Sequence, residues 1–168
     1  NESEAIWSEV DRMLKDPRAE TMVTRFHREW LHLYRLPGLE KDLSVYPLYN
    51  AKLSAAMVEE IDRVTTHLVF ETPGLFRNLL DTSVSFVNAK LAQLYQTPFD
   101  PAEGSNWVKT TLGPERKGLL NRAAFAASHA YPHASSPIHR GHFIIENLLC
   151  QKLVIPPFPI TELPEVPN

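Results

Sequence analysis

Apolar residues recur at every third or fourth position along most of the chain, the spacing that places them on one face of an α-helix. This pattern predicts a short helix over residues 4–14, a long helix from residue 17 to the Pro37-Gly38 pair, and a second long helix after Asn50. Strand signals are nearly absent, and only the segment 107–109 could form a short strand. We therefore expect an all-α fold, a bundle of about six helices with one long irregular loop and a proline-rich C-terminal tail.

Shorter helices are expected further along, at 75–80, 86–95, 118–129 and 136–150, with a polar turn over 81–85. These elements suggest four parts. Residues 1–95 form an N-terminal helical part, and residues 96–115, rich in Pro, Gly, Ser, Thr and Asn, form a loop or linker. Residues 116–152 form a C-terminal helical pair packed on the first part. The proline-rich residues 153–168 form an extended tail or a linker to a following domain.

Three helix starts carry N-cap signals. Asp16 and Ser136 each precede a proline, which suits the first helical position, and Asn50 precedes the second long helix.

The first long helix has one predicted buried face. Its apolar set comprises Met22, Val23, Phe26, Trp30, Leu33 and Tyr34. We expect the Phe26, Trp30 and Tyr34 stripe to belong to the core, and we expect His27, His32 and His67 to lie at the surface or to cap helices.

Composition excludes several classes of protein. The 168 residues are 43% hydrophobic and 22% charged, values of an ordinary globular chain that buries a core. Lys and Arg number 17 and Asp and Glu number 20, a net charge of -3, so a basic nucleic-acid-binding surface is not expected. No run of 18 apolar residues is present, and we expect no membrane span.

The chain has one cysteine, Cys150, so an internal disulfide is impossible. It also lacks the Cys-x-x-Cys-His motif of covalent haem attachment, and we expect no haem bound covalently by this chain. Cys150 is expected to be a small buried apolar residue. The alternative is that it forms half of a disulfide to a segment outside the chain.

Four of the seven histidines fall within residues 128–142, which is the densest concentration of candidate chemistry. They are His129, His133, His139 and His142. Histidine is a common metal ligand and an acid–base group near neutral pH, and His139 and His142 would share a helix face. No zinc motif or intervening carboxylate accompanies them. The four are weak metal-site candidates, and the alternative is a polar loop followed by a helix start.

Arg140 lies in the predicted first turn of the last helix, where the helix dipole disfavours a cation. A partner for it is therefore expected, either a buried carboxylate or an anionic ligand shared with free backbone N–H groups. The structural alternative is that Arg140 bonds to carbonyls of the preceding loop. Ser135 and Ser136 precede this turn, and Trp107 and Tyr131 are expected to be exposed aromatics. These five residues are the candidate binding residues. No catalytic residue is assigned.

Several motifs resemble two families of domains of unknown function. Residues 116–120 (RKGLL) resemble the R-x-G-L-L opening of one family, and residues 135–141 (SSPIHRG) resemble its T-S-P-x-x-R-G signature, with Ser135 in place of Thr. Residues 16–19 (DPRA) and 85–95 (SFVNAKLAQLY) are similar to motifs of a companion family.

The resemblance implies a cellular context. The two families occur in tandem in large secreted proteins of planctomycetes and myxobacteria, fused to c-type cytochrome modules. It implies a secreted or periplasmic helical module that acts as a scaffold or docking surface beside haem domains, in a redox process of unknown substrate. Haem c would lie on neighbouring domains, and the partner would be a cytochrome domain of the same parent protein.

Two other function classes remain open. One is an enzyme with a His-based metal site that acts on a polymer. The other is a peptide- or glycan-binding module that uses Trp107 and Tyr131.

Overall fold

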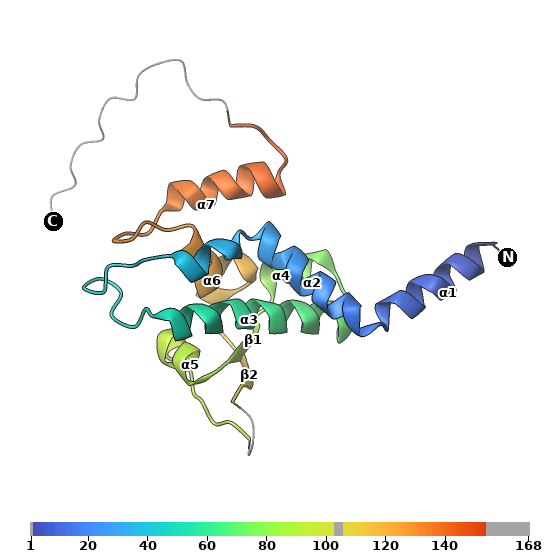
Figure 1. Cartoon of the computed structure of the whole chain (residues 1–168), viewed down its shortest axis with the longest axis horizontal. Coiled ribbons are helices and arrows are strands. Elements are labelled where there is room, and N and C mark those ends of the chain that lie inside the picture. Colours follow the sequence, from blue (N-terminus) through green and yellow to red (C-terminus); the bar gives the residue numbers. More distant parts are fainter. Residues whose placement is uncertain (1, 103–105, 154–168) are drawn as a thin grey trace. The chain divides into compact units, whose positions relative to one another are not determined.

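The computed structural model of the chain describes residues 2–102 and 106–153. The described residues divide into two compact units, the first ending at Ser136 and the second beginning at Pro137. Helices dominate both, and the expected all-α class is confirmed (Figure 1). No helix among the described residues combines the length and the apolar character needed to cross a bilayer. The expected proline-rich tail lies outside the described residues, Leu153 apart.

The first half of the first unit is built around one long helix. The elements are α1 (Glu2–Leu14), α2 (Pro17–Trp30), the 3₁₀ helix η1 (Leu33–Gly38) and α3 (Ala51–Phe70). Both predicted caps at these helices are confirmed, because the Asp16 side chain accepts from the Arg18 N–H and Asn50 accepts from the Leu53 N–H. Helix α3 packs against α2 and against most of the later elements of the unit, so it forms the centre of the core.

The later elements of the first unit are shorter, and they include a two-stranded sheet. They are α4 (Phe76–Asp81), β1 (Val84–Val87), α5 (Ala89–Tyr95), β2 (Val108–Thr111), the 3₁₀ helices η2 (Pro114–Arg116) and η3 (Leu119–Asn121), and α6 (Ala123–Ser128). Strands β1 and β2 are antiparallel, with Val84 opposite Thr111 and Val87 opposite Val108.

Strand β2 overlaps the expected strand segment, whereas β1 corrects the prediction of a turn followed by a helix from residue 86. Phe86 and Val87 belong to the strand, and α5 begins only at Ala89. Asn88 fixes the start of α5, because its side chain accepts from the N–H groups of Lys90 and Leu91 and so caps the helix.

The predicted helix over 118–129 is also shorter than expected. Gly118 has φ +70°, a conformation outside the helical region, so a 3₁₀ turn precedes α6. In the second unit, α7 (Pro137–Phe143) is followed by a π-helical segment, η4 (Ile144–Leu148).

The buried face of α2 differs from the predicted one. Val23 is buried as predicted and His27 is buried as well, whereas Phe26 is 57% exposed and Met22 and Tyr34 are similarly exposed. The prediction that Phe26 and Tyr34 belong to the core is therefore wrong. The helix also ends at Trp30 rather than at the Pro37-Gly38 pair, since His32 adopts a left-handed conformation before η1 begins.

Candidate functional site

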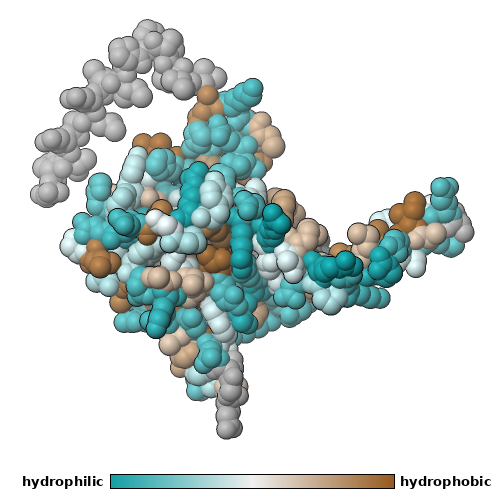
Figure 2. All heavy atoms as spheres, viewed as in Figure 1, coloured by the Kyte–Doolittle hydropathy of each residue, from teal (hydrophilic) through white to brown (hydrophobic). Residues whose placement is uncertain are grey.

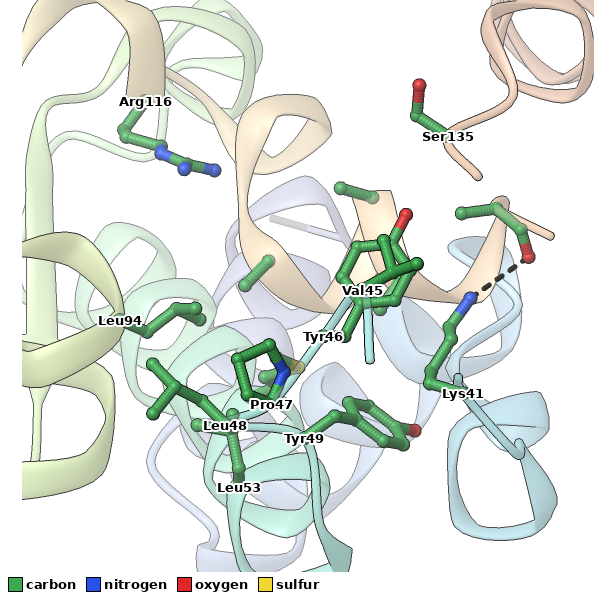
Figure 3. A pocket seen from close by; sticks show the side chains of 15 residues that line it. Lys41, Val45, Tyr46, Pro47, Leu48, Tyr49, Leu53, Leu94, Arg116 and Ser135 are labelled. Atoms are coloured by element: carbon green, nitrogen blue, oxygen red, sulfur yellow. Dashed lines mark hydrogen bonds between the residues drawn. The ribbon is translucent and has the colours of Figure 1, made fainter. Parts of the chain in front are cut away.

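A groove of about 360 Å³ opens on the first unit, between the segment 41–49 and helix α6 (Figure 3). We call it the tyrosine groove. One side carries Tyr46, Pro47, Leu48 and Tyr49 from the segment, with Leu53 and Met57 from α3 and Leu94 from α5. The other side, which we call the alanine wall, carries Ala123, Ala126 and Ala127 of α6 and Ala130 just after it. The small side chains leave the α6 wall smooth, and the remaining lining is mostly apolar, as is typical of small-molecule sites.

Hydrogen bonds tie the 41–49 segment to the loop that follows α6. The Asp42 N–H donates to the Pro132 carbonyl at 2.9 Å. The Lys41 ammonium donates to the carbonyls of Ala130 and Tyr131 at 3.1 and 3.0 Å. Asp42 also accepts from the backbone N–H of Ser44, which stabilises the turn. These bonds fix the position of the 41–49 segment relative to the loop that follows α6.

Among the described residues, the groove is lined by two cations, Lys41 and Arg116, and by no carboxylate. The Arg116 guanidinium lies 5.2 Å from the centroid of the Tyr95 ring, a cation–π contact. Burial lowers the pKa of the Lys41 ammonium, because the charged form loses hydration. The groove therefore combines an apolar body with positive charge.

A buried polar network lies among α3, β1, α5 and α6. The Glu60 carboxylate accepts from the Ser85 hydroxyl and from the Tyr95 hydroxyl, each at 2.6 Å. Arg122 Nη1 lies 3.5 Å from Glu60 Oε1, and both side chains are fully buried. The Ala123 N–H donates to the Tyr95 hydroxyl at 3.0 Å, so the network fixes the start of α6.

Burial sets the electrostatics of this network. Loss of hydration raises the pKa of Glu60, an effect that Arg122 and the two hydroxyl donors oppose. Burial and the adjacent Glu60 carboxylate raise the pKa of Tyr95 well above its ordinary value. Loss of hydration also lowers the pKa of Arg122. The Glu60 carboxylate is therefore compensated by the Ser85 and Tyr95 hydroxyls and by the Arg122 cation.

A second exposed feature lies on α1, which buries no residue in the described structure. Trp7 is 69% exposed and Ile6 is 60% exposed, and Met13 and Leu14 are also open to solvent. Figure 2 shows hydrophobic residues along α1 among hydrophilic ones. On α2 the exposed Phe26 ring stacks on the Trp30 ring, with centroids 6.2 Å apart. We refer to the four apolar residues of α1 as the α1 apolar face.

Comparison with known protein families gives two matches along the chain. The family model PSD4, described as "Protein of unknown function (DUF1592)", matches residues 1–97, more than half of the chain. The chain belongs to the DUF1592 family. Residues 116–168 of this DUF1592 protein match a second model, PSCyt3, described as "Protein of unknown function (DUF1588)". The expected tandem of two families of unknown function is thereby confirmed. No curated protein and no solved structure matches the chain.

The two matched segments of this DUF1592 protein share one core. Arg122 from the DUF1588 match pairs with Glu60 from the DUF1592 match. The tyrosine groove likewise takes one wall from the first segment and its alanine wall from the second. The first compact unit therefore needs residues from both matches.

The predicted binding residues of the DUF1592 protein lie in different places. Ser135 is exposed and lines the tyrosine groove, whereas Ser136, next to it, is buried. Tyr131 is exposed and stacks with His133, with centroids 6.4 Å apart. Trp107 is half-buried, and the Arg63 guanidinium lies 4.7 Å from its ring centroid. Arg140 is half-buried in α7 of the second unit.

The four candidate histidines divide between the two units. His129 is buried in the first unit, where its Nδ1 lies 3.0 Å from the Phe125 carbonyl, while His133 is exposed. His139 and His142 lie in the second unit, and His142 Nε2 is 3.3 Å from a Glu146 carboxylate oxygen. Within the described ranges, no three His, Cys, Asp or Glu side chains are grouped as a metal site.

Three expectations about single residues of the DUF1592 protein are wrong. Cys150 was expected to be buried, but it is exposed and adopts a left-handed conformation at the end of the helical segment. His27 and His67 were expected at the surface, but both are buried. The His27 Nδ1–H donates to the Val23 carbonyl at 2.8 Å, and His67 bonds to Glu71 at 2.7 Å. These bonds compensate the burial of the two rings.

The burial of His27 predicts sensitivity to acid. Burial lowers the pKa of His27 from its ordinary value of 6.5, so the unfolded chain takes up a proton before the folded chain does. Stability therefore falls as the pH decreases below 6.5, by at most about 1.4 kcal/mol for each pH unit. We expect the free energy of unfolding, measured with urea, to fall less between pH 7.5 and pH 5.5 for His27→Gln than for the parent protein.

The matched control is His133→Gln, which changes an exposed ring. A pH dependence that is identical in the parent and in both variants would show that His27 has the same pKa in the folded and in the unfolded chain, contrary to the prediction.

Sequence reasoning missed the Glu60 network, although a signal was present. Glu60 lies three residues after Met57 and four before Val64, on the apolar face of α3. A carboxylate at such a position predicts a buried partner, because an unpaired charge is costly to bury. The partners Ser85, Tyr95 and Arg122 lie too far along the chain for spacing to identify them.

Proposed function

We propose that this DUF1592 protein is a helical docking module of a secreted or periplasmic multidomain protein. It acts as a scaffold for a c-type cytochrome domain of the same parent protein, in a redox process. The neighbouring domain carries haem c, and this chain supplies a contact surface. The resemblance of its sequence motifs to modules fused to cytochromes supports this context.

The α1 apolar face is the observation that carries the proposal. A helix of 13 residues that buries none of them against the described chain leaves its hydrophobic surface without a partner. Large apolar side chains gathered on one exposed helix are typical of a protein–protein contact. Trp7 is the largest of them, and tryptophan is enriched among the residues that dominate binding energy.

The net negative charge of α1 indicates that the contact surface of the partner is basic. Helix α1 carries Glu2, Glu4, Glu9 and Asp11 against the single cation Arg12. Such an excess of acidic residues favours association with a partner that carries cations around its contact surface. Electron-transfer contacts are commonly small, below about 1,200 Å² of buried area, so a single helix face is a suitable size. The complex is expected to weaken with added salt.

Replacement of Trp7 tests the proposal. We expect Trp7→Ser to raise the Kd for the purified cytochrome domain of the parent protein about 30-fold, since a central Trp contributes roughly 2 kcal/mol or more to such interfaces. Isothermal titration calorimetry with the full chain measures this change. Because Trp7 contacts solvent, circular dichroism and thermal unfolding of the variant are expected to match those of the parent protein.

The matched control is Phe76→Ala on α4, which removes an aromatic ring that is 61% exposed but lies off α1. Its Kd is expected to stay within twofold of the parent value. The docking proposal fails if the parent chain forms no complex, or if both variants weaken binding equally.

A further inference from the structure

The tyrosine groove has a charge that differs from the rest of the chain. The sequence has more carboxylates than cations, yet the described residues that line the groove include two cations and no carboxylate. The nearby Glu60 carboxylate is fully buried and already engaged with Ser85, Tyr95 and Arg122. The groove therefore favours an anionic occupant by charge complementarity.

Arg116 is placed to receive the anionic group. Its guanidinium is held over the Tyr95 ring, and in the part of the chain that the structure describes it forms no ion pair. A guanidinium presents five N–H donors and matches the planar fork of a carboxylate or the oxygens of a sulfonate or phosphate. A stacked, half-buried Arg with these donors available is a suitable anchor for an anion.

Lys41 lies on the other side of Tyr46 from Arg116 in the close-up view (Figure 3). Two of its three N–H donors are taken by the carbonyls of Ala130 and Tyr131, which leaves one directed elsewhere. Its position is fixed by these two bonds. Lys41 therefore adds positive potential and one N–H donor, whereas Arg116 offers the planar set of guanidinium N–H donors.

The body of the groove selects an apolar, flat molecule. The alanine wall of α6 is smooth, and Tyr46 and Leu48 line the groove from the 41–49 segment. The volume of about 360 Å³ is at the lower end of the range for small-molecule sites. Ser135 lies at the rim, with its hydroxyl directed away from the other labelled side chains of the groove (Figure 3).

We propose that the tyrosine groove binds a small amphipathic organic anion. Its flat apolar body lies between the alanine wall and Tyr46, and its carboxylate, sulfonate or phosphate pairs with Arg116. This site shares no residue with the α1 apolar face, so the proposal is tested independently of the docking function.

Two fluorescent probes test the proposal on the folded full chain. The anionic probe is 8-anilinonaphthalene-1-sulfonate, and the neutral probe is N-phenyl-1-naphthylamine, which has the same rings without the sulfonate. We expect one anionic probe to bind per chain, about tenfold or more tightly than the neutral one, because a hydrogen bond to a charged group strengthens binding by this factor.

Substitutions locate the bound probe. Arg116→Gln is expected to weaken the anionic probe about tenfold and to leave the neutral probe unchanged. Arg77→Gln removes an exposed cation of α4 and is the matched control, with no change expected for either probe. Ala127→Leu fills the groove and is expected to abolish binding of both probes. Trp7→Ser is expected to change neither, since the α1 apolar face lies elsewhere.

Three results would overturn the proposal. These are equal binding of the two probes, equal effects of Arg116→Gln and Arg77→Gln, or binding that survives Ala127→Leu but is lost in Trp7→Ser. Thermal unfolding of each variant is measured in parallel. Should Arg116→Gln not fold, Arg116→Lys keeps the charge but loses the fork, and it is expected to weaken the anionic probe selectively.

Discussion

Replacing Arg122 with Met is expected to lower the free energy of unfolding by about 3–5 kcal/mol, because the change leaves a buried carboxylate without its cation. Glu60 and Arg122 are both fully buried, with Nη1 3.5 Å from Oε1. Arg122 Nη2 also donates to the carbonyls of Val84 and Thr82 at 2.8 and 3.3 Å, so β1 and the turn before it lose a donor as well. Urea unfolding followed by circular dichroism measures the loss.

The effect of Arg122→Met is expected to depend on pH. Without the cation the pKa of Glu60 rises further, and the folded state then requires the protonated acid. A carboxyl whose pKa is raised in the folded state loses stability as the pH rises, so the destabilisation should be larger at pH 8 than at pH 5.5.

The double variant Arg122→Met with Glu60→Gln is the control for the buried charge. It removes the unpaired carboxylate, and we expect it to be more stable than Arg122→Met alone. If Arg122→Met does not fold, Arg122→Lys, which keeps a charge but not the fork, replaces it. A loss below about 1 kcal/mol for Arg122→Met would contradict the importance of this ion pair.

Replacing Gly118 with Ala is expected to cost about 3 kcal/mol or more. Gly118 has φ +70° and ψ 168°, a region that is essentially restricted to glycine. A Cβ at this position would lie 2.1 Å from the Leu80 carbonyl oxygen and 2.4 Å from its carbon. The Gly118 N–H also donates to the Thr82 carbonyl at 2.8 Å, so the backbone cannot move away without loss of that bond.

Gly38→Ala is the matched control, since a Cβ on Gly38 meets nothing within 4 Å and its φ is not positive. We expect its urea midpoint to equal or exceed that of the parent protein, whereas the midpoint of Gly118→Ala falls sharply. Equal midpoints for the two variants would mean that the close approach of residues 80 and 118 is not required for the fold.

Local signals account for the elements that could be predicted. Asp16 and Asn50 cap helices where expected, because an N-cap bond joins a side chain to an N–H only two or three residues away. The long apolar repeat of α3 also identified the helix that forms the core. Strand β1 was missed because four residues are too few to show a period, and its partner β2 lies more than twenty residues further along the chain.

The face of a helix that becomes buried depended on its neighbours. The apolar repeat predicted that Met22, Val23 and Phe26 share the buried face of α2. In the fold, Val23 lies against the core as predicted, and His27 is buried beside it, where its Nδ1–H donates to the Val23 carbonyl, whereas Met22 and Phe26 are exposed. The aromatic residues therefore remain exposed, which the repeat alone could not indicate.

The sequence by itself determined the helical class, the main helix starts, the tandem of two families and the concentration of candidate residues near position 135. Only the tertiary structure brought Glu60 to Arg122, placed Arg116 over Tyr95 and formed the tyrosine groove from segments 41–57, 94 and 116–135. The physical reason is the separation along the chain over which each kind of interaction acts. Helix propensity and capping act over a few residues, whereas compensation of a buried charge and the shape of a groove depend on side chains that meet only after the chain has folded.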